Sequence, residues 1–93
     1  LTRSSDLGHD LGEVRTVLLA LHRACPELQP AILQAGQAVA EALRQRSADD
    51  AARWGAVTAA WSAVEKLRIE HARIAPWLVT SDRILASWAA HLG

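Results

Sequence analysis

Residues 7–25, LGHDLGEVRTVLLALHRAC, carry apolar side chains at spacings of 4, 3, 4, 3 and 4: Leu7, Leu11, Val14, Leu18, Leu21 and Cys25. This alternation brings the six side chains onto one face of an α-helix, which is the pattern of a helix that packs lengthwise against others. The same type of spacing recurs to the end of the chain, and no strand pattern interrupts it. The sequence therefore predicts an all-α protein.

Length and charge narrow the possible functions. Ninety-three residues predict a single domain, 1–93, which is either complete or a piece of a longer chain. Ten acidic and ten basic residues cancel, and the bases are scattered, so we expect no nucleic-acid partner. No apolar run approaches the roughly 18 residues of a membrane span, and no basic-then-apolar leader is visible. We therefore expect a cytoplasmic protein without a membrane partner.

Prolines and capping residues divide the chain into four helices. Pro26 ends the first helix, because the residue before a proline is disfavoured in helical geometry, and Pro76 is expected to end the third in the same way. A capping box at Ser47 and Asp50 opens the third helix, and Thr80, Ser81 and Asp82 open the fourth. The expected helices span residues 5–24 with Ser4 or Ser5 as N-cap, then 27–30 to about 46, 48–75 and 80–91. Their short connections predict an antiparallel four-helix bundle.

The core is predicted from the apolar face of each helix. We expect burial of Leu11, Val14, Leu18, Leu21, Ile32, Val39, Leu43, Val57, Trp61, Val64, Leu67, Ile74, Leu85 and Trp88. Leu28 and Leu33 are expected to point inward on the second helix as well, and Trp54 and His71 extend the stripe of the third.

Two groups of residues are candidates for binding. Four tryptophans are many for a core this small and alanine-rich, and tryptophan is enriched at interfaces, so we expect Trp54 or Trp77 to face a partner. Alternatively, Trp54, Trp61 and His71 line a cavity for a small molecule. Small residues four apart on the first helix, Gly8, Gly12 and Thr16, continue to Ala20 and Ala24 and predict either tight internal packing or a self-association interface.

Residues 9–18, HDLGEVRTVL, resemble the phosphorylated segment of sensor histidine kinases, in which a His-Asp/Glu-Leu sequence lies on a long dimerising helix. The resemblance implies that His9 is an exposed phosphate acceptor and that the acid beside it orients the imidazole. The chain departs from the family pattern at Gly12, where the family usually has Arg or Lys, and it lacks the family's Pro-Leu.

The sequence contains no catalytic set at a recognisable spacing. Ser62, Ser87 and His71 would have to converge from separate helices, and one cysteine forms neither an internal disulfide nor a cysteine metal cluster. We expect no cofactor and no metal. Our interpretation is a non-catalytic protein-interaction or dimerisation module, with a homo-oligomer as the expected assembly. A small-molecule-binding bundle and a histidine phosphotransfer module remain the alternatives.

Overall fold

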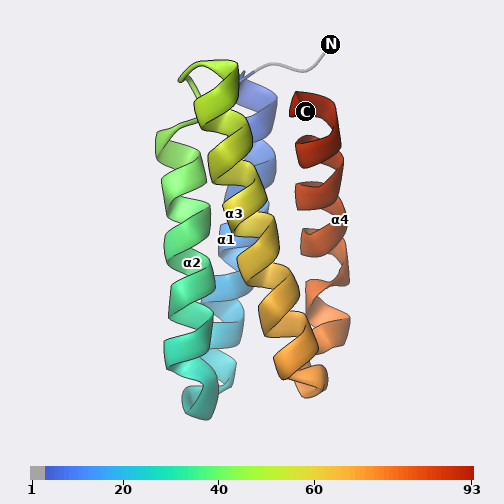
Figure 1. Ribbon diagram of the computed structural model, residues 1–93. Helices are drawn as coiled ribbons and strands as arrows, with labels where there is room; N and C mark the ends of the chain where they lie inside the picture. The colour runs from blue at the N-terminus through green and yellow to red at the C-terminus, as the bar shows by residue number, and fades with distance from the viewer. Residues whose placement is uncertain (1–3) are drawn as a thin grey trace.

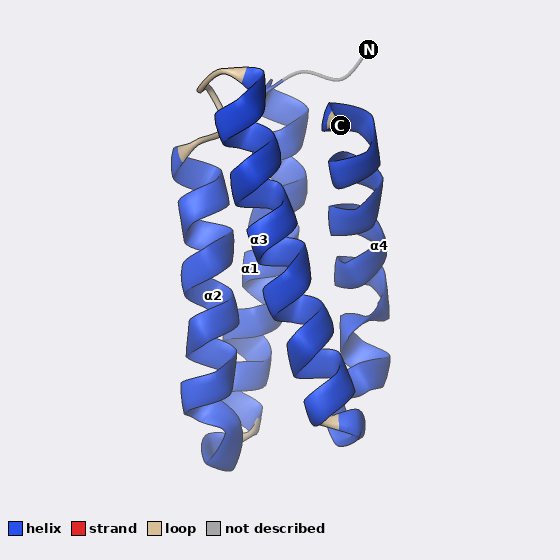
Figure 2. Ribbon diagram, viewed as in Figure 1, coloured by secondary structure: helices blue, strands red, loops and turns tan. Residues whose placement is uncertain are grey.

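The computed structural model describes the backbone from Ser4 to Gly93 and the side chains from Asp6 onward. Its helices lie side by side in a bundle of 37 × 19 × 18 Å, and the start of α1 and the end of α4 lie at the same end of the bundle (Figure 1). Within residues 4–93 every regular element is helical, as Figure 2 shows, so the predicted all-α four-helix bundle is confirmed. The elements in order are α1 (Ser4–Ala24), η1 (Pro26–Leu28), α2 (Gln29–Arg44), α3 (Asp50–Glu70), η2 (Ala72–Ile74) and α4 (Ala75–Leu92).

The first two helices begin and end close to their predicted limits. α1 ends at Ala24, and Cys25 has the non-helical angles φ −126° and ψ 76° before Pro26. α2 runs from Gln29 to Arg44 with a proline in its first turn, where proline costs no hydrogen bond. The predicted caps Ser4 and Ser5 have side chains outside the described part of the chain.

The boundary between the third and fourth helices was predicted wrongly. α3 ends at Glu70, His71 leaves helical geometry at φ −129° and ψ 72°, and α4 already begins at Ala75. Pro76 therefore opens α4 instead of closing α3, because proline fits the first turn of a helix. Residues 80–82, predicted as a cap, lie inside α4. With 21 residues each, α1 and α3 match in length.

The N-cap of α3 also differs from the prediction. Asp49, not Ser47, occupies the cap position, and its Oδ1 accepts a hydrogen bond of 2.8 Å from the backbone N–H of Ala52. A carboxylate satisfies a free amide of the first turn and also interacts well with the positive end of the helix dipole. The acidic pair at 49–50 was therefore the better capping signal.

The predicted core is buried almost throughout. Leu43 and Trp61 are the exceptions, since both are half-buried at its margin. Leu33 was predicted to point inward but is 53% exposed, because it lies about 100° around α2 from the buried Ile32. The remaining members of the predicted core are buried: Leu11, Val14, Leu18, Leu21, Ile32, Val39, Val57, Val64, Leu67, Ile74, Leu85 and Trp88.

Two indole–carboxylate hydrogen bonds attach α4 to its neighbours. The Nε1–H of Trp61 on α3 donates to Oδ1 of Asp82 on α4 at 3.0 Å. The Nε1–H of Trp88 on α4 donates to Oδ2 of Asp10 on α1 at 2.7 Å. Each bond satisfies the single polar atom of a large apolar side chain, so the indole packs against the core without an unpaired donor.

Replacing Leu18 with alanine tests the core. Leu18 is 2% exposed, so Leu18→Ala should lower the free energy of unfolding by about 2–5 kcal/mol through lost burial and the remaining cavity. Leu19→Ala is the matched control, since Leu19 is adjacent in the sequence and its side chain is 48% exposed. Chemical denaturation measures both variants. Equal losses for the two would contradict the assigned core face.

Glu41 near the end of α2 predicts a pH-dependent contribution to stability. The side chains of Gln45 and Arg44 donate hydrogen bonds to the Glu41 carboxylate and lower its pKa from the usual 4.5, and the effect of Gln45 is the larger. A lowered folded-state pKa stabilises the fold above pH 4.5, and this contribution disappears as the pH falls through the folded-state value. Denaturation at neutral and strongly acidic pH should therefore show Glu41→Gln to be more destabilising at neutral pH. An equal loss of stability at the two pH values would contradict this contribution.

Candidate functional site

An apolar groove runs between α1 and α4. Its lower part, in the orientation of Figure 1, has a volume of about 390 Å³. It is lined by residues of α1, the turn after α1, η2 and α4: Val17, Ala20, Leu21, Ala24, Cys25, Ile74 and Trp77. Its upper part, nearer the chain ends, has a volume of about 320 Å³ and is lined by Glu13, Thr16, Val17, Thr80, Ser81 and Ile84. Val17 borders both parts, so we treat them as one feature, the α1–α4 groove.

One polar contact joins α1 to α4 beyond one end of this groove, and another joins the adjacent turns η1 and η2 beyond the other end. Near the chain termini, Trp88 donates its hydrogen bond to Asp10. At the opposite end of the bundle, where η1 and η2 lie (Figure 1), Arg73 of η2 forms an ion pair with Glu27 of η1. Between these contacts, α1 presents the small side chains of Thr16, Ala20 and Ala24, which are too short to fill the space. The groove is therefore a consequence of small residues placed between two attachment points.

A second apolar groove lies on the other side of α1, against α2. It has a volume of about 260 Å³ and is lined by Arg15, Leu18, Leu19, His22, Ile32, Leu33, Gly36, Gln37 and Ala40. Leu19 and Leu33 flank it as exposed leucines, while the buried Leu18 and Ile32 lie beneath. We refer to it as the α1–α2 groove. The apolar spacing did not predict this groove, although Leu33 lies about 100° around α2 from the core residue Ile32, which indicates an exposed position.

The predicted binding residues Trp54, Trp61, His71 and Trp77 lie at different places. Trp54 lies near the end of the chain, where a Cβ built on Gly93 would come within 3.0 Å of its Nε1. His71 follows the other end of α3, about 25 Å away along the helix. Trp61 lies between them and bonds to Asp82. The structure thus separates Trp54 from His71, and of the four residues only Trp77 lines a groove described above, where it is 61% exposed.

The predicted interface residues Gly8, Gly12 and Thr16 face in different directions. A spacing of four residues advances about 40° around a helix at each step, so the row winds around α1. A Cβ on Gly8 would meet Cδ of Arg46 at 3.2 Å, which indicates internal packing near the end of α2. A Cβ on Gly12 would meet nothing within 4 Å, and Thr16 lines the α1–α4 groove. Only Thr16 and the alanines beyond it contribute to a groove.

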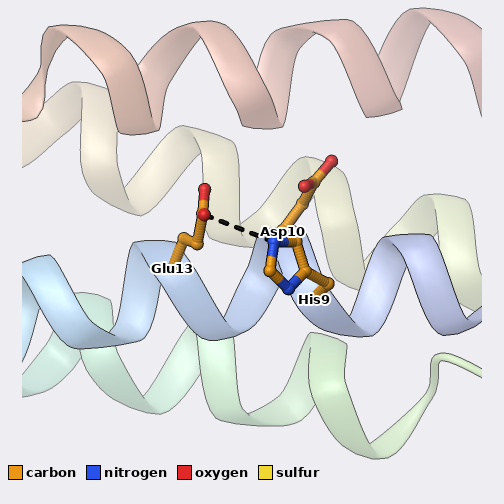
Figure 3. Close-up of side chains that lie close together, drawn as sticks. All are labelled: His9, Asp10 and Glu13. Atoms are coloured by element: carbon orange, nitrogen blue, oxygen red, sulfur yellow. Dashed lines mark ion pairs between the residues drawn. The ribbon is translucent and has the colours of Figure 1, made fainter.

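His9, Asp10 and Glu13 form a cluster on the outside of α1 (Figure 3). Potential ligand atoms of the three lie within 4.8 Å of one another. His9 is 72% exposed at its side chain, as predicted, and its Nε2 lies 3.3 Å from Oε1 of Glu13. Asp10, the acid that the kinase resemblance assigns to His9, instead accepts the Trp88 hydrogen bond. Within the described residues, no other helix adds a ligand atom to the cluster, so we interpret it as a surface contact.

Comparisons with family models, with curated proteins and with solved structures found no significant match to this chain. In the part of the chain that the structure describes, no helix is both long and apolar enough to cross a membrane. The two grooves and the residues that line them are therefore the features of this chain that bear on its function.

Removing the acceptor of the Trp88 hydrogen bond tests how α4 is attached to α1. Asp10→Ala leaves the indole N–H of a buried side chain unpaired, so the free energy of unfolding should fall by about 1–3 kcal/mol. Asp10→Asn keeps a carbonyl oxygen as acceptor and should lose less. Urea denaturation of the two variants measures the difference. If both variants were as stable as the unmodified chain, the hydrogen bond would not contribute to the attachment of α4 to α1.

Proposed function

We propose that this chain is a non-catalytic helical protein-interaction and dimerisation module whose partner is a second copy of itself. The two copies would meet along the α1–α4 groove, not through the Gly8 side of α1. Within this proposal the setting is the cytoplasm, where the free thiol of Cys25 stays reduced.

The observation that carries this proposal is the exposed Trp77 beside an open apolar groove. A tryptophan that is 61% exposed leaves a large apolar surface in water, and tryptophan is enriched at the centres of interfaces. The small α1 residues Thr16, Ala20 and Ala24 would allow a helix of the second copy to approach closely. A stable dimer buries at least about 1,000 Å², so the contact would extend over both parts of the groove.

The placement of potential catalytic side chains supports a role without catalysis. Ser62 is exposed within α3, Ser87 is exposed near the end of α4, and His71 lies beyond the far end of α3. Ser62 and His71 are about 13 Å apart along the helix axis, which is beyond hydrogen-bond reach. A nucleophile and base need such contact to act together.

A small apolar ligand in the same groove is the second candidate function. The lower part of the groove has a volume of about 390 Å³, which lies within the roughly 300–1,000 Å³ of ligand pockets. Trp77 would then cover an aromatic or aliphatic molecule. This candidate replaces the cavity expected from Trp54, Trp61 and His71, because the structure spreads those side chains along α3.

Native mass at several protein concentrations tests the proposal. The unmodified chain should change from monomer to dimer mass as its concentration rises, while Trp77→Glu should remain a monomer because a buried charge opposes the contact. Trp54→Glu is the matched control, since Trp54 is 46% exposed but lies outside the groove.

The same measurement separates the alternatives. A monomer mass at all concentrations, or an equal effect of the two tryptophan variants, would contradict dimerisation through this groove. A monomer that carries a small additional mass, lost in Trp77→Glu, would instead support the ligand-binding candidate.

A further inference from the structure

We propose that the α1–α2 groove binds an acidic amphipathic helix of a different protein. This groove lies on the α2 side of α1 and shares no lining residue with the α1–α4 groove. The inference therefore holds whether or not the chain dimerises as proposed above.

The shape of the groove suits the side chains of a helix. Its volume of about 260 Å³ is below the usual range for a whole small-molecule ligand. The exposed Leu19 and Leu33 form its two walls, one on each helix, over the buried Leu18 and Ile32. An amphipathic helix inserts apolar residues at positions i, i+3, i+4 and i+7 into a groove of this kind. The exposed leucines would then be covered by its apolar face.

Gly36 keeps this groove open. It lies in the middle of α2, where glycine costs about 1 kcal/mol of helix stability relative to alanine. A Cβ at this position would meet nothing within 4 Å, so packing inside the chain does not require a glycine. A larger residue would extend into the space between the leucines.

The charge of the residues that line the groove indicates an acidic partner. Arg15 and His22 line the groove, and none of its lining residues is acidic. Arg15 is exposed and forms no ion pair with any described residue. The rim therefore has an unpaired positive charge that glutamate or aspartate on a partner would complement.

The same charge argues against a second copy in this groove. In a two-fold contact each copy presents the same surface, so Arg15 would meet a face that carries the same positive charge and lacks acids. Like charges brought together in this way oppose association. A partner of opposite charge fits the groove better.

Two synthetic peptides of about 18 residues, or five helical turns, test the proposal. Both carry leucine at helical spacing, and the remaining positions are alanine with glutamate in one peptide and lysine in the other. Fluorescence anisotropy of the labelled peptides measures binding to the full chain. The glutamate peptide should bind more tightly, and added salt should weaken its binding. Equal binding of the two peptides would overturn the charge assignment.

Three variants locate the binding site. Gly36→Leu should abolish binding of the glutamate peptide by filling the groove, whereas Gly55→Leu, an equally open helical position on α3, should leave it unchanged. Arg15→Glu should weaken the glutamate peptide by about tenfold and improve the lysine peptide. Circular dichroism confirms that each variant keeps its helices.

Two results would overturn the proposal. One is glutamate-peptide binding that survives Gly36→Leu. The other is a loss of the chain's own dimer mass in Gly36→Leu, which would assign the groove to a second copy.

Discussion

Closure between the first and last helices depends on one hydrogen bond between residues far apart in the sequence. Trp88 near the end of α4 is buried, and its indole N–H can only donate, so its burial requires an acceptor at that point. Asp10 of α1 supplies it at 2.7 Å. The contact joins α4 to α1 near the chain termini, while Arg73 and Glu27 join the neighbouring elements at the opposite end.

The α1–α4 groove follows from the side-chain volumes between those two attachments. Alanine favours helix but fills little space, so helices rich in alanine rely on a few large residues to fill the interior. Trp88 near the end of α4 and Trp61 in the middle of α3 provide that bulk and direct their polar atoms to Asp10 and Asp82. In the lower half, Ala20 and Ala24 face Trp77, which stays largely exposed.

The two sides of α1 differ in what they offer a partner. Toward α4, the groove has Glu13 as its one charged lining residue and ends beside a tryptophan. Toward α2, it is flanked by leucines and has a cationic rim at Arg15. One helix therefore separates two apolar surfaces of different charge, which is the basis for assigning them to different partners. The exposed His9–Glu13 pair lies at the edge of the α1–α4 groove, because Glu13 also lines its upper part.

The sequence by itself determined the helical class, the limits of α1, and the buried seam from Leu11 to Leu21, because periodic burial and a proline after Cys25 act locally. It misplaced the α3–α4 boundary, because a proline opens or closes a helix according to the geometry of the residues before it, as at His71 and Pro76. Only the tertiary structure decided that Asp10 accepts the hydrogen bond of Trp88 and that Asp82 accepts that of Trp61. Those outcomes depend on which helix lies opposite each side chain, and spacing along one helix carries no such information.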